Sequence, residues 1–204
     1  MMIATTSAAE RILPAELAAA PAQTFAGDTD YRLASGSDSR AEHPALHGLC
    51  TAATASGHLL ETRVDLAQTP ILRWRWRVDR GPVGVDPRTR EGDDHAARIY
   101  LVHERWPRWR SRVVSYVCSL TEPAGADWPN PYSAQFAMVA VAGREAALGQ
   151  WRDEQRDVAA DFQRLHGLQI DRIDALAVMT DCDNTDQPAE AWYGPIEWHA
   201  AEPD

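Results

Sequence analysis

Cysteine is scarce in this sequence and follows no recognised spacing. The three cysteines, Cys50, Cys118 and Cys182, lie far apart, and no two of them form a CxxC pair. An odd number without paired spacing indicates neither a disulfide framework nor a zinc site. We therefore expect each cysteine to act as a small, buried apolar residue.

Long apolar runs are also missing. No stretch of about 18 apolar residues occurs, so the sequence predicts no membrane span. The N-terminal segment lacks a basic region, and Glu10 and Arg11 interrupt its apolar part, which is unlike a secretory signal. We expect a cytoplasmic or periplasmic protein with no clear signal peptide in this chain.

Positive charge is in deficit, and the common catalytic motifs are absent. Lys and Arg number 20 against 30 Asp and Glu, which gives a formal net charge of −10. Because such a surface repels phosphate, we expect no nucleic-acid partner. The sequence has no Walker A or GxGxxG loop, no HExxH and no GxSxG. These absences argue against nucleotide binding and against an enzyme that pairs a nucleophile with a histidine.

What is present is typical of a globular protein. The 204 residues are 45% hydrophobic and 25% charged, which suits one sizeable core. Residues 1–24 are rich in Ala, Thr and Pro, and we expect an N-terminal arm there, either loose or with a short helix around Ala15 to Ala20. Residues 25–204 then form a single domain.

Short segments rich in β-branched and aromatic residues follow one another along that domain, separated by Gly, Pro and polar clusters. One good helix is predicted near residues 157–167, where Asp157 can cap the start and Gly167 can end it. Many strands with one short helix, and no helix–strand alternation, predict a mainly β fold, an antiparallel β-sandwich. The strands are expected at residues 31–34, 46–54, 57–66, 72–78, 96–104, 112–120, 135–143, 173–181 and 191–199.

The stretch RWRWRV, from Arg73 to Val78, combines basic and aromatic residues in strict alternation. In a strand this spacing puts Trp74 and Trp76 on one face and the arginines on the other. We expect the tryptophans to lie in the core. Arg73, Arg75 and Arg77 would then face water, an acidic neighbouring strand, or a groove across the sheet.

Two acidic clusters stand at strand ends. The first, Glu91, Asp93 and Asp94, comes shortly before a predicted strand that contains Arg98. The second, Asp181, Asp183, Asn184 and Asp186, directly follows a strand that ends at Met179. Loops of a sandwich can converge on one rim, and oxygen-rich loops suit a hard cation such as calcium. The second cluster lacks the turn glycine and the closing glutamate of an EF-hand. Solvated turns, a ligand or cation site, and a pair of catalytic carboxylates all remain open.

A second feature is the turn RWPRWRS, expected at the tip of a β-hairpin. Arg105, Arg108, Arg110 and Arg112 alternate there with Trp106 and Trp109. Arginine and aromatic rings together can bind anionic groups and stack on flat ligands. A solvated turn and a polyanion or sugar contact are both compatible with this pattern.

Several short segments occur in a fixed order along the chain: TPILRWRWRV, GDDHAARIYLVHE, YVCS, WRDEQRDVAADFQRLHG and AVMTDCDNT followed by AWYGPIEW. Together they resemble a bacterial family known as domain of unknown function 3047. The resemblance implies a single β-sandwich similar to galactose-binding-like jelly rolls, a class that includes many carbohydrate-binding modules, and it implies no defined activity. Recurrent polar positions of the family fall on Asp93, Asp94, Arg98, Asp181, Asp183, Asn184, Tyr193 and Gly194.

From these observations we expect a non-catalytic β-sandwich that binds a carbohydrate or a similar polar ligand. Its carboxylates and Asn184 would accept hydroxyl hydrogen bonds or hold a cation, Arg98 would orient a carboxylate, and Tyr193 would offer a stacking face. No cofactor is expected apart from calcium at the acidic turns. The alternatives are a glycoside hydrolase that uses one carboxylate from each cluster, and an assembly partner that docks through the Arg–Trp hairpin tip. The sequence leaves the ligand and the oligomeric state open.

Overall fold

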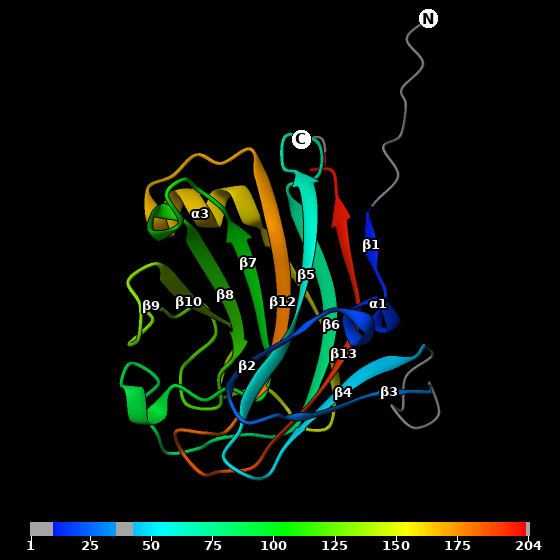
Figure 1. The fold of residues 1–204 in the computed structure, drawn as a ribbon, viewed down its shortest axis with the longest axis vertical. Helices are drawn as coiled ribbons and strands as arrows, with labels where there is room; N and C mark the ends of the chain where they lie inside the picture. Colours follow the sequence, from blue (N-terminus) through cyan, green and yellow to red (C-terminus); the bar gives the residue numbers. More distant parts are fainter. Residues whose placement is uncertain (1–9, 36–42, 203–204) are drawn as a thin grey trace, which may run out of the picture.

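Two β-sheets stacked face to face make up the molecule (Figure 1). The structure, a computed structural model, describes residues 10–35 and 43–202. The six-stranded sheet has the order β11 (Trp151–Asp157), β6 (Ile71–Arg80), β13 (Ala189–His199), β4 (Ala45–Cys50) and β3 (Asp30–Ala34), and β1 (Arg11–Ile12) also pairs with β13. The seven-stranded sheet has the order β2 (Ala22–Ala26), β5 (Ala55–Asp65), β12 (Arg172–Asp181), β7 (Arg98–His103), β8 (Arg112–Cys118), β10 (Phe136–Ala142) and β9 (Asp127–Pro129). The predicted β-sandwich is confirmed.

One strand pair departs from the expected antiparallel arrangement. Strands β8 and β10 run parallel, with Phe136 opposite Val113 and Val139 opposite Tyr116. The chain between them passes through β9, which pairs antiparallel with β10. A parallel pair requires such a crossover, because a tight hairpin can join only antiparallel strands.

The alternation in RWRWRV has the predicted consequence. Trp74 is 3% exposed and Trp76 is fully buried, so both rings lie in the core between the sheets. The Trp74 ring stacks on Tyr116 of the other sheet, with 5.3 Å between ring centroids. Burying a large apolar side chain contributes roughly 1.5–3 kcal/mol. These rings therefore help to hold the two sheets together.

The arginines on the opposite face meet a strand that the sequence did not predict. Strand β11 has the sequence WRDEQRD and lies at the edge of the six-stranded sheet. Edge strands are often rich in charged residues. The strand therefore shows no alternation of apolar and polar residues from which it could be predicted. Arg73 donates to the side-chain oxygen of Gln155 at 2.7 Å, and Arg75 lies 3.3 Å from Asp153. A groove of about 530 Å³ also runs along this face beside Arg73 and Arg75.

Arg77 behaves differently from its two neighbours, because it does not face water. Its side chain is 3% exposed, and its guanidinium lies 4.6 Å from the ring centroid of Trp192 and 5.8 Å from that of Trp151. It also donates two hydrogen bonds of 2.8 Å to the carboxylate of Asp79. The third arginine of the run is thus a packed part of the sheet face.

The predicted helix is present as α3 (Val158–His166), near one end of β7 and β8 (Figure 1). The Asp157 side chain accepts from the Ala160 amide at the start, and Gly167 ends the helix with a φ of 65°. Positive φ costs glycine little, which explains this stop. Phe162 is fully buried, so the helix covers the end of the core.

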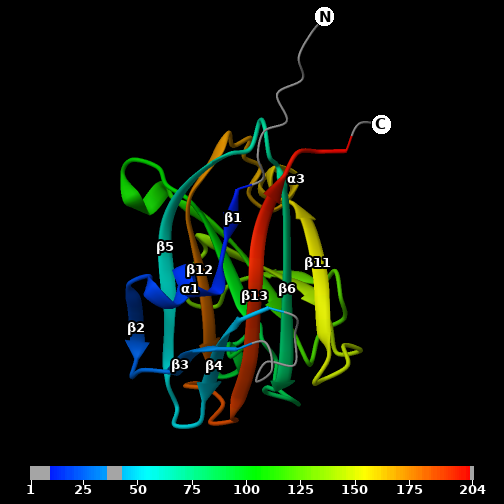
Figure 2. The ribbon, with the colours of Figure 1, turned by 90° about the vertical axis from the view of Figure 1, so that its right-hand side faces the viewer.

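The N-terminal segment, expected as an arm over residues 1–24, lies on the sandwich in its described part, residues 10–24. Strand β1 pairs with β13, and β2 pairs with β5 (Figure 2). Between them lies α1 (Pro14–Ala19), so of the two alternatives for this segment the structure has the short helix, and its Leu17 is fully buried. Within the described residues, no helix is both long enough and apolar enough to cross a membrane.

The expectation for the cysteines was wrong for two of the three. Cys50, at the end of β4, forms a disulfide with Cys182, just beyond β12, across a sequence separation of 132 residues. Spacing in the sequence gave no sign of this bond, because the fold alone brings the two strand ends together. Cys118 is free and buried, as predicted. The disulfide ties the six-stranded sheet to the turn that holds the second acidic cluster.

Candidate ligand-binding site

The two acidic clusters, 90 residues apart in the sequence, meet at one end of the seven-stranded sheet. Asp94 accepts hydrogen bonds from the Asn184 amide at 3.1 Å and from the Thr185 amide at 2.6 Å. The Thr185 hydroxyl and the Asn184 side-chain amide also donate to Asp94, at 2.6 Å and 2.9 Å. One carboxylate from the first cluster therefore holds the turn that carries the second.

Arg98 and Asp181 form the centre of this contact. They lie on the neighbouring strands β7 and β12, and Nη2 of Arg98 donates to Oδ2 of Asp181 at 2.5 Å. The same Nη2 donates to the backbone oxygen of Asp93 at 2.5 Å, and the His95 amide donates to Oδ1 of Asp181 at 3.0 Å. The group Asp93, Asp94, Arg98 and Asp181 is named here the buried polar cluster.

Burial sets the electrostatics of the cluster. Burial raises the pKa of Asp181 to about 8, although the positive charge of Arg98 opposes this shift. Burial also raises the pKa of Asp93, again against the charge of Arg98. His95 is buried beside Arg98, and both effects hold its pKa well below the usual value. Asp93 and Asp181 therefore bind protons more readily than exposed aspartates do, and His95 beside the cluster is a neutral imidazole.

Five of the seven predicted site residues lie beneath the surface. Asp93, Asp94, Arg98, Asp181 and Tyr193 are between 1% and 4% exposed. The carboxylate that Arg98 orients belongs to Asp181 of this chain. Tyr193 offers no stacking face, because its ring is buried and its hydroxyl donates to the Met179 backbone oxygen at 2.5 Å. Only Asp183 and Asn184 are partly exposed.

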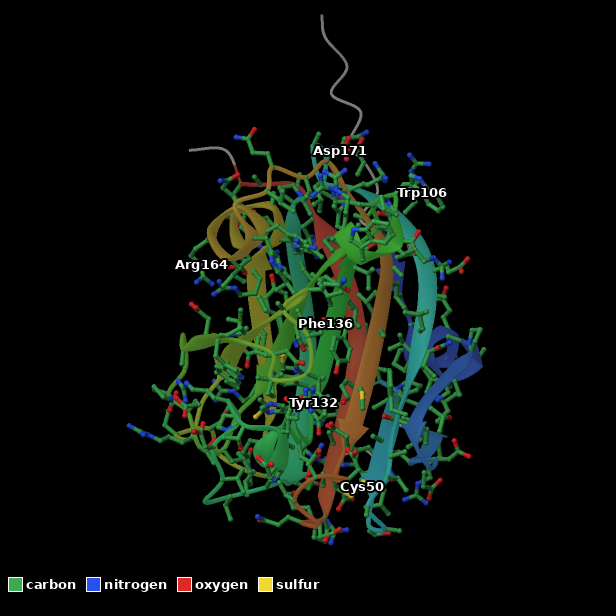
Figure 3. The ribbon with its side chains drawn as sticks, turned by 60° about the vertical axis from the view of Figure 1, so that its left-hand side comes forward. Cys50, Trp106, Tyr132, Phe136, Arg164 and Asp171 are labelled. Carbon is green, nitrogen blue, oxygen red and sulfur yellow. A yellow bond between two sulfur atoms is a disulfide. The ribbon has the colours of Figure 1, made fainter. Side chains whose placement is uncertain are left out.

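Three aromatic residues that the sequence did not single out as site residues are linked to this region: Tyr132 contacts Asn184, Tyr100 contacts Arg98, and Phe136 contacts Tyr100. Tyr132 is 52% exposed, and its hydroxyl donates to the side-chain oxygen of Asn184. Tyr100 and Phe136 are half-buried, and their ring centroids lie 6.0 Å apart. Figure 3 shows Phe136 and Tyr132 on the same face of the molecule. The three residues Tyr100, Tyr132 and Phe136 are named here the aromatic rim.

The rim is connected to the buried polar cluster by hydrogen bonds. Nη1 of Arg98 donates to the Tyr100 hydroxyl at 3.1 Å, and burial raises the pKa of Tyr100 to about 12. The Asn130 side chain donates to Asp93 at 2.8 Å and accepts from the Tyr132 amide at 3.0 Å. One signal in the sequence could have found Tyr100, since it lies two residues after Arg98 and so shares its face of the strand.

The same turns contain the candidate calcium ligands. Carboxylate oxygens of Asp94, Asp181 and Asp183 lie within 4.8 Å of one another. Both oxygens of Asp94 and both of Asp181 already accept hydrogen bonds, from Asn184, Thr185, His95 and Arg98. A cation here would have to displace these donors and lie near the positive charge of Arg98. The arrangement therefore suits a cation poorly, and the calcium site stays a prediction.

Similarity to known proteins is limited. No curated protein matches the sequence. Solved structures with a similar shape include a family 11 carbohydrate-binding module from a Clostridium thermocellum cellulosomal cellulase, with a TM-score of 0.48, 10% identity, and coverage of 90% of this chain and 89% of that one. A low-affinity xylan-binding module from Roseburia intestinalis has a TM-score of 0.36 and 9% identity, with 96% and 97% covered.

A third similar structure is the glycoside hydrolase domain of Endo-D from Streptococcus pneumoniae R6, with a TM-score of 0.45 and 11% identity. The match covers 90% of this chain and spans only 22% of that one. A family model, in contrast, matches residues 21–197, which is most of the sequence. The segments that resemble this family include the buried polar cluster described above. The chain therefore belongs to the family described as protein of unknown function (DUF3047).

Proposed function

We propose that this protein binds a carbohydrate, without transforming it, at the aromatic rim. The observation that carries the proposal is the contact between Tyr132 and Asn184, which puts an exposed ring directly beside side-chain oxygens. Sugars present apolar C–H faces that stack on aromatic rings and hydroxyl groups that donate to carboxylate and amide oxygens. The rim, with Asp183 and Asn184, offers both kinds of contact.

The buried polar cluster has a supporting role in this proposal. Its side chains are too deeply buried to contact a sugar, but they fix the turn that carries Asp183 and Asn184 and the strand that carries Tyr100. A site held in place before the ligand arrives costs less entropy on binding. The cluster thus prepares the rim and does not itself contact the ligand.

The same burial argues against glycoside hydrolysis at this place. A hydrolase needs two carboxyl groups that reach opposite sides of the glycosidic bond. Asp94 and Asp181 are 1% and 2% exposed, and both accept hydrogen bonds from this chain. Among the four aspartates predicted as site residues, only Asp183 is partly exposed, which supports binding in place of catalysis; the exposed Glu91 and Asp186 lie outside that set.

The disulfide supports one of the two expected compartments. Structural disulfides persist in oxidising compartments and are rare in a reducing cytoplasm. The bond between Cys50 and Cys182 therefore favours the periplasm for this protein. This inference concerns the cellular compartment in which the disulfide persists, and it does not depend on which ligand the protein binds.

A glycan array tests the proposed function. The purified chain is applied with calcium and, separately, with a chelator, and we expect at least one glycan to bind in both conditions. For that glycan, Tyr132→Ala and Phe136→Ala should weaken binding by at least about tenfold, because stacking area is lost. Phe25→Ala is the matched control, since Phe25 is a 75% exposed ring on the distant edge strand β2. An array without any binder, or equal losses in all three variants, would overturn the proposal.

A further inference from the structure

The tip of the β7–β8 hairpin carries two exposed tryptophans that the proposed function does not use. Trp106 is 87% exposed and Trp109 is 70% exposed. Figure 2 shows the tip, in green, standing out from the body of the sandwich. In Figure 3, Trp106 lies near one end of the molecule, and Tyr132 of the rim lies toward the other. Exposed rings of this size are uncommon on a soluble protein unless they contact something.

A hollow of about 530 Å³ opens beside Trp106. It is lined by residues 103–106 at the hairpin tip and by residues 169–172 in the loop that leads into β12. Figure 3 shows the labelled Trp106 and Asp171 close to each other at this end. The volume lies in the usual range for small-ligand sites, about 300–1,000 Å³. One wall is thus an exposed indole, and the rest is mostly polar.

The two arginines of the hollow differ in their partners. Arg172 is held by Asp174, with 2.7 Å between Nε and Oδ1, and lies 3.4 Å from Asp171. Arg105 is half-buried, and its guanidinium has no ion pair or hydrogen bond to any of the residues that the structure describes. A cation beside an exposed ring and without a carboxylate partner is suited to an anionic group on a ligand.

The two segments that form the hollow, counted with the rest of the hairpin tip, carry a net charge of the opposite sign to that of the whole chain. Residues 103–112 and 169–174 contain five arginines, Arg105, Arg108, Arg110, Arg112 and Arg172, against the three carboxylates of Glu104, Asp171 and Asp174. The whole chain has a formal net charge of −10. A small anion is influenced mainly by charges within about 8 Å at physiological salt, whereas an extended anionic surface also meets the repulsive remainder. Charge therefore favours a short acidic ligand over a membrane or a nucleic acid.

We propose that this hollow is a second binding site, for an acidic oligosaccharide that carries uronate carboxylates. Trp106 provides the ring on which a sugar stacks, and Arg105 pairs with the carboxylate of that sugar. Gln169 and Arg172 also line the hollow and would contact its hydroxyl groups. The proposal uses none of the residues of the aromatic rim, so the two binding sites can be tested independently of each other.

Calorimetric titration with defined tetrasaccharides tests this site. The probes are oligogalacturonate, oligomannuronate and hyaluronan, with fully methyl-esterified oligogalacturonate as the uncharged control. We expect at least one acidic probe to bind at low salt and to bind more weakly as sodium chloride is added. Arg105→Gln and Trp106→Ala should each weaken that binding by at least about tenfold. Trp109→Ala, an exposed tryptophan of the same tip outside the hollow, should change it by less than about twofold.

Four results would overturn the proposal. They are the failure of all three acidic probes to bind, equal binding of the methyl ester, a loss in Trp109→Ala as large as in Trp106→Ala, and binding of phosphatidylglycerol vesicles in place of the saccharides. All the substituted side chains lie at the surface tip. Circular dichroism of each variant confirms that a loss of binding is not a loss of fold.

Discussion

Asp181 shows most directly how burial changes the chemistry of a single residue in this protein. Its pKa is raised to about 8 by burial, whereas an exposed aspartate has a value of 3.8. The folded state therefore binds one more proton than the unfolded state between these two values. The contribution of Asp181 to the free energy of unfolding is fully present below pH 3.8. It is lost as the pH rises through the folded-state pKa of about 8.

Substitution of Asp181 tests whether its raised pKa makes the protein less stable as the pH rises. We expect the melting temperature of the wild-type chain to fall by several degrees more than that of Asp181→Asn when the pH is raised from about 5 to about 9. The buried His95 titrates in both proteins, so the difference between the two curves isolates Asp181. Parallel melting curves across this range would show that the carboxyl is not responsible.

Arg98 provides the positive charge beside Asp181. Among the described residues it is the only arginine that contacts this carboxyl group. At about pH 9, where Asp181 is ionised, Arg98→Ala leaves this buried carboxylate without a cation and should lower the free energy of unfolding by about 3–5 kcal/mol. The double variant Arg98→Met with Asp181→Asn removes both charges and should be more stable than Arg98→Ala alone. Urea unfolding measures both, and a double variant less stable than the single one would refute a charge-based role.

Polar site residues could be recognised from the sequence, but their burial could not. Asp94 and Asn184 stand in turns, and turns are usually solvated, so an open ligand site was the natural expectation for them. The burial of Asp94 depends on its contact with Asn184, 90 residues away in the sequence, which no local pattern encodes. Tyr132 was missed for the same reason, since its contacts with Asn184 and Arg90 join segments that are distant in the sequence.

At the scale of elements, strands with a buried face were predictable and strands without one were not. Strand β6 alternates apolar and charged residues, and the structure confirms both its place and its facing. Strand β11 has no apolar face, and its pairing with β6 comes from hydrogen bonds and from contacts such as Arg75 with Asp153. Strand direction was beyond prediction too, as the parallel pair of β8 and β10 shows.

The link between β4 and the turn after β12 gives a prediction at this scale. Intact-mass analysis of the unfolded, unreduced chain after alkylation should show one modified cysteine, Cys118, and reduction should raise this to three. Three modified cysteines without reduction would contradict the disulfide. Cys50→Ser with Cys182→Ser should then lower stability by about 2–5 kcal/mol, because the unfolded chain is no longer restrained.

At the scale of the whole molecule, the fold creates the candidate site by bringing together parts that are distant in the sequence. Tyr100 comes from β7, Tyr132 from the loop before β10, and Asn184 from the turn after β12. The disulfide fixes that turn to the six-stranded sheet, and the buried polar cluster fixes it to the seven-stranded one. Global fold class followed from composition and strand pattern, whereas this convergence required the structure.

The most direct test is a crystal structure of the chain soaked with the glycan that binds most strongly on the array. We predict a sugar ring over Tyr132 or Phe136, with hydroxyl groups within hydrogen-bond distance of Asp183 and Asn184. A glycan bound at another surface, with the aromatic rim left uncovered, would contradict the account.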